Sequence, residues 1–102
     1  MLCTVTVRRL RPGTYEAFRE AVTPEYWPAG LKNVLLLRNG EDPDEVCTIG
    51  YLDMSADQLD TLRDSPELMT AEAERIERVA AFADTVVVNG VFEVTDDLRP
   101  PA

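Results

Sequence analysis

The stretch that most constrains the fold runs over residues 33–53 and predicts two paired strands. Residues 33–38 form a short apolar run, residues 39–44 are rich in turn formers, and residues 45–53 return to β-branched and aromatic side chains. This order predicts a β-hairpin. Alternation along the second strand gives two faces, one with Cys47, Ile49 and Tyr51 and the other with Val46, Thr48, Gly50 and Leu52. Because neither face is polar, both need cover. Helices can cover one face, and a second subunit or a ligand must cover the other.

Length and composition limit the class of protein. The 102 residues are predicted to form a single domain over residues 1–96 and a C-terminal tail over residues 97–102. A partner would help so small a domain if its sheet has a second apolar face. No apolar run approaches the roughly 18 residues that a membrane span needs, which argues against a membrane protein. Arg8 and Arg9 follow the first apolar segment, the reverse of a secretory signal, so we expect a cytoplasmic protein.

Charge and cysteine content exclude further classes. The net charge of −9 argues against a nucleic-acid partner, because a polyanion would be repelled. The group Arg8, Arg9 and Arg11 can hold one anion, although solvated charges at a strand end explain it better. With no histidine and only Cys3 and Cys47, the sequence predicts no metal site and no cofactor. Buried free thiols are the simpler interpretation of both cysteines, and a disulfide between them stays open.

Residues 1–30 are expected to form a strand, a helix and a stiff loop. A strand over residues 2–9 precedes a helix that starts near Thr14 and must end before Pro24. Residues 23–30 then hold two prolines, a glycine, Tyr26 and the only tryptophan, Trp27. A tryptophan in such a loop either plugs its own core or lines the mouth of a cavity, and the plug is the simpler interpretation.

Two helix starts follow the hairpin. Ser55 and Gln58 fit a capping box, which predicts a short helix to about residue 64. Ser65 and Pro66 predict a second helix that continues to about residue 82 or 83. The apolar residues of this second helix recur at helical spacing and predict its inward face: Met69, Ala73, Ile76, Ala80 and Ala83, widened by Leu68, Val79 and Phe82.

Residues 84–96 are strand-like, and Asn89 and Gly90 near their centre allow two interpretations. The pair is a strong hairpin signal, but a single strand with a bulge at Gly90 is preferred, because a glycine inside a strand often marks a bulge. The full order is then β-α-β-β-α-β. This order predicts a ferredoxin-like α+β fold, in which an antiparallel sheet carries helices on one face.

This arrangement resembles the dimeric α+β barrel superfamily, and within it the antibiotic biosynthesis monooxygenase-like proteins. The resemblance covers residues 2–96 and rests on chain length, element order, the hairpin at 35–52, the split second helix and the last strand at 91–94. It includes no catalytic motif. The resemblance implies a homodimer whose two sheets pack face to face, with a cavity between the sheet and the helices of each subunit.

The resemblance also implies a choice of activities. Haem degradation, which in this superfamily uses an axial histidine, is disfavoured because the chain has none. The first hypothesis is a cofactor-independent monooxygenase that acts on aromatic or phenolic compounds. The alternatives are a non-catalytic ligand-binding or structural homodimer and a small isomerase or cyclase of the same fold. The residues leave all three open.

The candidate site residues are those that suit an apolar pocket for an aromatic small molecule. Quinone-forming members of the family use an Asn, Trp and Tyr group near an arginine; this chain has the residue types but not the matching positions, so no role is transferred. The candidate catalytic residues are Arg38, which can stabilise a phenolate, Tyr51, and Asp53 as a base. Packing, turn formation or surface ion pairing also explains each of them. The predicted pocket lining is Tyr26, Trp27, Asn33, Tyr51, Met69 and Phe82.

Overall fold

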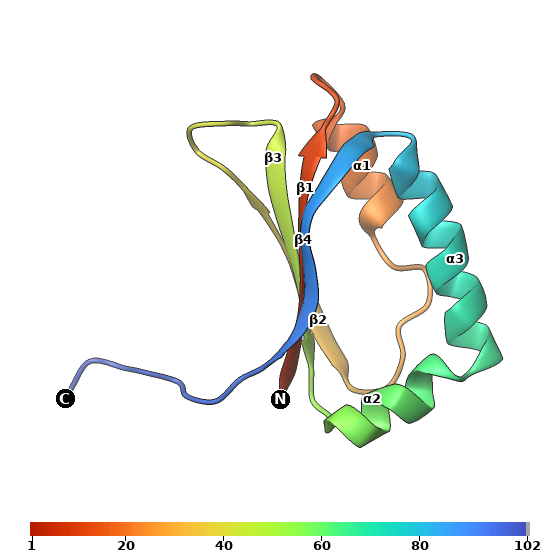
Figure 1. The fold of residues 1–102 in the computed structure, drawn as a ribbon, viewed down its shortest axis with the longest axis vertical. Helices are drawn as coiled ribbons and strands as arrows, with labels where there is room; N and C mark the ends of the chain where they lie inside the picture. The colour runs from red at the N-terminus through yellow and green to blue at the C-terminus, as the bar shows by residue number, and fades with distance from the viewer. Residues whose placement is uncertain (102) are drawn as a thin grey trace.

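Seven elements make up the fold in the computed structural model, which describes residues 1–101 apart from the side chain of Thr85. They are β1 (Leu2–Leu10), α1 (Tyr15–Val22), β2 (Leu31–Arg38), β3 (Glu45–Leu52), α2 (Ala56–Arg63), α3 (Pro66–Ala80) and β4 (Ala83–Glu93). The strands form one antiparallel sheet in the order β2-β3-β1-β4, and the helices lie on one side of it (Figure 1). The predicted ferredoxin-like α+β fold is confirmed.

The strand register assigns each paired residue to one face of the sheet. Val5 of β1 and Leu35 of β2 both lie opposite Ile49 of β3, so these side chains share the face turned away from the helices. The same register places twelve residues on this outer sheet face: Cys3, Val5, Val7, Asn33, Leu35, Leu37, Cys47, Ile49, Tyr51, Val88, Gly90 and Phe92. No charged residue is among the twelve. The two apolar faces predicted for residues 45–53 are therefore confirmed.

The helix-facing side of the sheet carries the core in two separate clusters. The upper core cluster, near α1 in Figure 1, consists of Leu10, Phe18, Ala21, Val22, Val46 and Val79. The lower core cluster, near α2, consists of Leu2, Leu52 and Leu59. Apolar side chains thus join sheet and helices at both ends of the molecule, and the middle of the sheet belongs to neither cluster.

The two helix starts predicted after the hairpin are confirmed by the hydrogen bonds of their N-caps. The backbone N–H of Gln58 donates to Ser55 Oγ at 3.2 Å, and Gln58 Oε1 accepts from the backbone N–H of Ser55 at 2.8 Å. Ser65 Oγ accepts from the backbone N–H of Leu68 in the same way. These bonds satisfy amides that the first helical turn leaves without partners.

The replacement Ser55→Ala is expected to lower the free energy of unfolding by about 1 kcal/mol, because it removes the side-chain oxygen that accepts from the backbone N–H of Gln58. Urea denaturation at a fixed protein concentration measures the change. Thr70→Ala, at an exposed position inside α3, serves as the control and should stay within about 0.5 kcal/mol of the parent. Equal losses for the two variants would contradict the capping role.

The predicted inward face of α3 is right at its edge, at Leu68 and Val79, and wrong along its central stripe. Met69 and Ile76 are 59% and 63% exposed, whereas Leu68 and Val79 are buried and the side chains of Glu72 and Arg75 face inward between them. The helix also ends at Ala80, before residues 82–83, because Ala83 already begins β4. A hydrophobic pattern places charged residues on the solvent side of a helix. Glu72 and Arg75 depart from this rule because they line a cavity between α3 and the sheet.

The last strand is single, as preferred, but its bulge is not at Gly90. Val7 pairs with Val88 and Arg8 pairs with Val86, so one register shift of β4 falls around residue 87, and a second falls between the partners of Arg9 and Leu10. Gly90 pairs regularly with Val5. A Cβ at Gly90 would lie 3.2 Å from the ring of Phe92, so the glycine accommodates that ring on the same face of the strand.

Residues 94–101 follow β4 without regular secondary structure and extend away from the domain on the side of the outer sheet face (Figure 1). The backbone N–H of Val94 donates to the carbonyl of Met1 at 3.0 Å, and Leu98 is 92% exposed. Ala102, the last residue of the predicted tail, lies outside the described residues.

Candidate functional site

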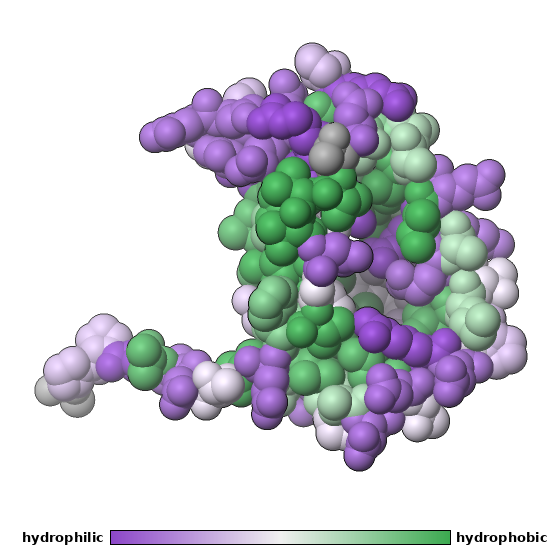
Figure 2. Space-filling view, viewed as in Figure 1, coloured by the Kyte–Doolittle hydropathy of each residue, from purple (hydrophilic) through white to green (hydrophobic). Residues whose placement is uncertain are grey.

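A cavity of about 520 Å³ lies between the sheet and the helices, and its lining reaches the middle of the sheet between the two core clusters. Figure 2 shows a hollow in the molecular surface between the sheet and the helices. The volume is within the ordinary range for small-molecule sites in proteins. The cavity is therefore the candidate functional site.

Small and polar residues of the sheet form the floor of this cavity. Two adjacent rows of the register cross all four strands here: Val34, Gly50, Thr4 and Val91, then Leu36, Thr48, Thr6 and Asn89. Seven of these eight residues line the cavity. At Gly50 an added Cβ would lie 2.6 Å from Thr4 Oγ1, so a larger residue could not enter without displacing Thr4. Short side chains in the middle of the sheet thus leave the space open.

The helices and the loop before β2 form the opposite wall. Its apolar part comes from Leu59 and Leu62 of α2 and Leu68 of α3, with Leu31 and Leu52 of the sheet beside them. Its polar part comes from Arg63, Glu72 and Arg75. Pro24, Tyr26 and Pro28 of the loop complete the lining. One cavity thus offers both apolar surface and charged groups.

A cluster of three charged side chains, Arg8, Glu72 and Arg75, forms the polar end of the site. Arg75 Nη2 lies 2.7 Å from Glu72 Oε2, and Arg8 Nη1 donates to Thr48 Oγ1 at 3.2 Å on the cavity floor. The guanidinium of Arg8 also lies 5.7 Å from the centre of the Phe18 ring. Burial lowers the pKa of Arg8 from its ordinary value, the charge of Arg75 lowers it further, and Glu72 opposes both effects. The guanidinium still stays protonated, as arginine does in proteins.

The Arg8, Arg9 and Arg11 group is divided by the fold. Arg9 pairs with Asp42, which lowers the pKa of that carboxyl group by hydrogen bonding. Arg11 Nε lies 2.6 Å from Asp84 Oδ1, and its Nη1 donates to the carbonyl of residue 81. Arg9 and Arg11 are exposed charges at a strand end, which is the interpretation that the sequence favoured. Arg8 instead points to the helix side and is partly buried.

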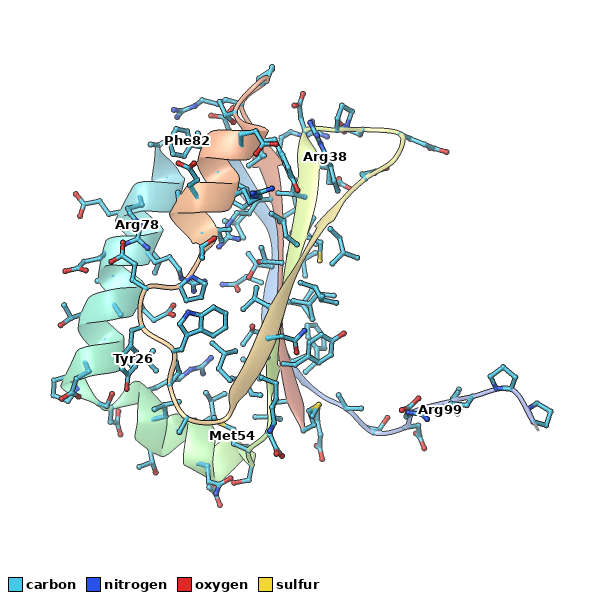
Figure 3. The ribbon with its side chains drawn as sticks, turned by 180° about the vertical axis from the view of Figure 1, so that it is seen from behind. Tyr26, Arg38, Met54, Arg78, Phe82 and Arg99 are labelled. Atoms are coloured by element: carbon cyan, nitrogen blue, oxygen red, sulfur yellow. The ribbon has the colours of Figure 1, made fainter. Side chains whose placement is uncertain are left out.

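Of the six residues predicted to line a pocket, Tyr26 lines this cavity (Figure 3). Trp27 follows it in the same loop but is 50% exposed and outside the lining, so it does not plug the core. Three of the others lie on other surfaces, because Asn33 and Tyr51 belong to the outer sheet face and Met69 is exposed on α3. Phe82 packs against the upper core cluster.

The candidate catalytic residues also lie apart from the cavity. The guanidinium of Arg38 lies 4.2 Å from the centre of the Tyr15 ring, and its Nε donates to the carbonyl of Pro43 at 2.9 Å. Figure 3 places Arg38 near the turn of the hairpin, far from Tyr26. Asp53 is exposed and pairs with Lys32. Tyr51 faces away from the helices.

Glu72 and Arg75 were not predicted as site residues, and Arg8 was predicted only as part of a strand-end group that can hold one anion. One signal for the charged pair was available, since Glu72 and Arg75 are three residues apart and so share a helix face. For Arg8 the signal was alternation, because it shares a face of β1 with Thr4 and Thr6. Neither signal shows that the two faces meet across a cavity.

Cys3 and Cys47 are free thiols in the structure. Both belong to the outer sheet face, but Cys3 pairs with Tyr51 and Cys47 with Val7, four residues further along the strands. Burial raises the pKa of the Cys47 thiol.

Among the residues that the structure describes, no three His, Cys, Asp or Glu side chains are grouped closely enough to hold a metal ion. Within the same residues no helix is long and apolar enough to cross a membrane.

Comparisons with known proteins give matches in structure and none in sequence. No protein-family profile matches the chain, and no curated protein matches its sequence. A structure from Chloroflexus aurantiacus, provisionally named an antibiotic biosynthesis monooxygenase, matches with a TM-score of 0.70 and 12% identity over 96% of each chain. A protein of the same provisional name from Nitrosomonas europaea matches with a TM-score of 0.68 and 13% identity, over 94% of this chain and 100% of the other. A third, from Deinococcus radiodurans, has a TM-score of 0.65 and 8% identity over the full length of both chains.

These matches cover almost the whole chain at low sequence identity, so they bear on fold. The resemblance inferred from element order is confirmed at that level. This chain has the ferredoxin-like α+β fold of the antibiotic biosynthesis monooxygenase-like structures.

Proposed function

We propose that the protein is a homodimer, joined through the outer sheet face, and that each subunit binds an aromatic small molecule in the cavity between its sheet and its helices. The observation that carries the proposal is the cavity of about 520 Å³, whose lining combines apolar walls with a few polar groups. The cytoplasmic location inferred from the sequence stays a prediction.

The outer sheet face supports the dimer. Its twelve residues include ten that are aliphatic, aromatic or cysteine, and Leu35, Leu37, Val88 and Phe92 are each more than two-fifths exposed in the single chain. A continuous apolar face of this kind marks an interaction surface in a protein that stays in solution. A second copy supplies a face of the same shape and chemistry, as twofold symmetry requires.

The reaction that the fold relatives suggest is a monooxygenation without metal or flavin. In such a reaction a phenol and O₂ give a quinone and water: one oxygen atom becomes the new carbonyl, the other leaves as water, and the phenol supplies all four electrons. The protein must exclude water, hold the phenolate and accept a proton. The leucine wall can exclude water, and Arg75 can stabilise negative charge.

A non-catalytic binding protein is the second candidate, because the described cavity lining offers one carboxylate as a proton acceptor. That carboxylate is Glu72, and it lies 2.7 Å from Arg75. The ion pair engages one of its two oxygens, Oε2, so that oxygen is not free to take a proton from a ligand. The binding function needs the same cavity and no base.

Ligand binding can be tested with the single tryptophan. Trp27 lies between Tyr26 and Pro28, which both line the cavity, so its fluorescence should change when the cavity fills. The titration uses polycyclic phenols and quinones, with fatty acids, flavin and haem as other ligand classes. Saturable quenching by the phenols is the expected result. If no compound in the panel gives a saturable change, and calorimetry also detects no binding, the proposed pocket function is wrong.

Oxygen consumption separates the enzyme from the binding protein. If Glu72 accepts the proton, Glu72→Gln should lower the rate about 100-fold or more with a phenol that binds, because general base catalysis contributes effects of that size. Glu74→Gln, on an exposed position of the same helix, is the matched control and should keep the parent rate. Saturable binding without oxygen consumption by the parent protein would favour the non-catalytic function.

A further inference from the structure

The cavity collects positive charge in a strongly acidic protein. The chain has a net charge of −9. The charged residues in the cavity lining are Arg63, Glu72 and Arg75, and Arg8 joins them through its hydrogen bond to Thr48 on the floor. Three positive groups and one negative group thus lie at the site. This distribution opposes the charge of the whole chain.

Ion pairing distinguishes two of these arginines, Arg8 and Arg63, from most of the other basic residues. Seven of the ten basic side chains lie within ion-pair distance of a carboxylate: Arg9, Arg11, Arg19, Lys32, Arg75, Arg78 and Arg99. For Arg8, Arg38 and Arg63 no such carboxylate is found among the described residues. Arg63 lines the cavity and Arg8 borders it through its hydrogen bond to Thr48, so the positive charge there is incompletely neutralised.

Arg8 is held in place without a carboxylate. Its Nη1 donates to Thr48, its guanidinium lies over the Phe18 ring, and it is partly buried among the helix-facing residues of the sheet. Glu72 is close enough to affect Arg8 electrostatically but forms its ion pair with Arg75. Burying a charge without a neutralising partner is costly. An anion entering the cavity would neutralise it.

We propose that the natural ligand of the cavity is an aromatic acid, whose carboxylate is bound by Arg8 and Arg75 while its rings lie against the leucine wall. This inference rests on the proposed small-molecule function and specifies the ligand class. A guanidinium can bind a carboxylate through two parallel hydrogen bonds. A carboxylic acid is already ionised at neutral pH, whereas a simple phenol, with a pKa of about 10, must lose a proton before it can form the same ion pair.

Three probes of the same ring size test the inference: 1-naphthoate, 1-naphthol and 1-naphthamide, titrated by calorimetry at pH 7 and low ionic strength. The parent protein is expected to bind the naphthoate about 10- to 100-fold more tightly than the naphthamide, as hydrogen bonds between charged groups predict. Added salt should weaken binding of the naphthoate and leave the naphthamide nearly unchanged.

Arginine variants identify the groups responsible. Arg8→Gln and Arg75→Gln are each expected to remove most of the preference for naphthoate and to change naphthamide affinity less than about threefold. Arg8→Lys, which keeps the charge, should restore part of the preference. Arg38→Gln is the matched control, because Arg38 lies in the same row of the sheet and also stacks on an aromatic ring of α1, but donates to the carbonyl of Pro43 instead of to a residue of the cavity lining.

The outcomes distinguish failure of this inference from failure of the proposed function. Equal affinity for the naphthoate and the naphthamide, or equal weakening of both by Arg8→Gln, would overturn the anion site and leave the pocket intact. Tighter binding of 1-naphthol than of the naphthoate would overturn the inferred ligand class and indicate a phenol in place of a carboxylic acid. If the parent binds none of the three probes, the pocket function fails and the anion site fails with it. Circular dichroism of each variant confirms that it is folded.

Discussion

The variant Ile49→Asp is expected to be a monomer under conditions in which the parent protein is a dimer. Ile49 lies at the centre of the outer sheet face, between Val5 of β1 and Leu35 of β2. In a face-to-face dimer both copies of residue 49 would be buried. An isolated carboxylate buried without a partner costs several kcal/mol, and the symmetry of the dimer doubles the number of such groups. Each 1.4 kcal/mol changes affinity about tenfold, so we expect dimerisation to weaken at least about 1,000-fold.

Sedimentation equilibrium of both proteins over a range of concentrations measures this effect. The same substitution at Ile76, which is 63% exposed on α3, provides a matched control and should leave the dimer intact. Alkylation gives a second measurement, because Cys3 and Cys47 are on the outer sheet face and should react faster in the monomeric variant. A parent protein that is monomeric at micromolar concentration would refute the dimer, and so would a variant that dimerises as tightly as its parent.

Side-chain alternation predicted the sheet because a strand has only two faces. Along β3 the buried residues alternate with partly exposed ones from Val46 to Leu52, and the sequence shows apolar residues in both sets. The start of α2 was equally predictable from the sequence, since Ser55 and Gln58 need only each other to form the capping box. Features determined by neighbouring residues in the sequence were thus predictable.

The inward face of α3 was predicted only in part from its own sequence. Pattern analysis assumes that charged side chains face water, and by that rule Met69 and Ile76 belong inside. In the fold Glu72 and Arg75 neutralise each other at 2.7 Å and face a cavity, which removes much of the penalty for turning them inward. The error therefore coincides with the candidate site.

The cavity floor depends on residues far apart in the chain. Thr4, Gly50 and Val91 come together only because β1, β3 and β4 pair in one particular register. Each residue taken alone suits an ordinary strand or turn. Side-chain alternation also separates Arg8 from Arg9, which are neighbours in sequence but lie on opposite faces of β1. A site made by register across strands cannot be deduced from spacing within a single strand.

Replacing Phe18 by alanine is expected to have the largest effect on stability. Phe18, on α1, is fully buried in the upper core cluster, which joins the sheet, α1 and Val79 of α3. Its removal loses buried apolar area and leaves a hole that the surrounding side chains fill only in part, which together cost about 3–5 kcal/mol. Since proteins of this size are stable by about 5–15 kcal/mol, the variant should be close to unfolding. Urea denaturation at equal protein concentration measures the loss, because dimerisation would make stability depend on concentration.

The ring of Phe18 should also contribute through Arg8, whose guanidinium lies 5.7 Å from its centre. Phe18→Leu refills much of the space without the ring, so it is expected to cost less than half as much as Phe18→Ala. A double-mutant cycle of Phe18→Leu with Arg8→Gln isolates the interaction between the two side chains, for which we expect about 0.5–1 kcal/mol. A coupling near zero would show that Thr48 alone orients Arg8. A loss below about 1 kcal/mol for Phe18→Ala would contradict the assignment of Phe18 to the core, because removing a fully buried aromatic side chain costs several times more.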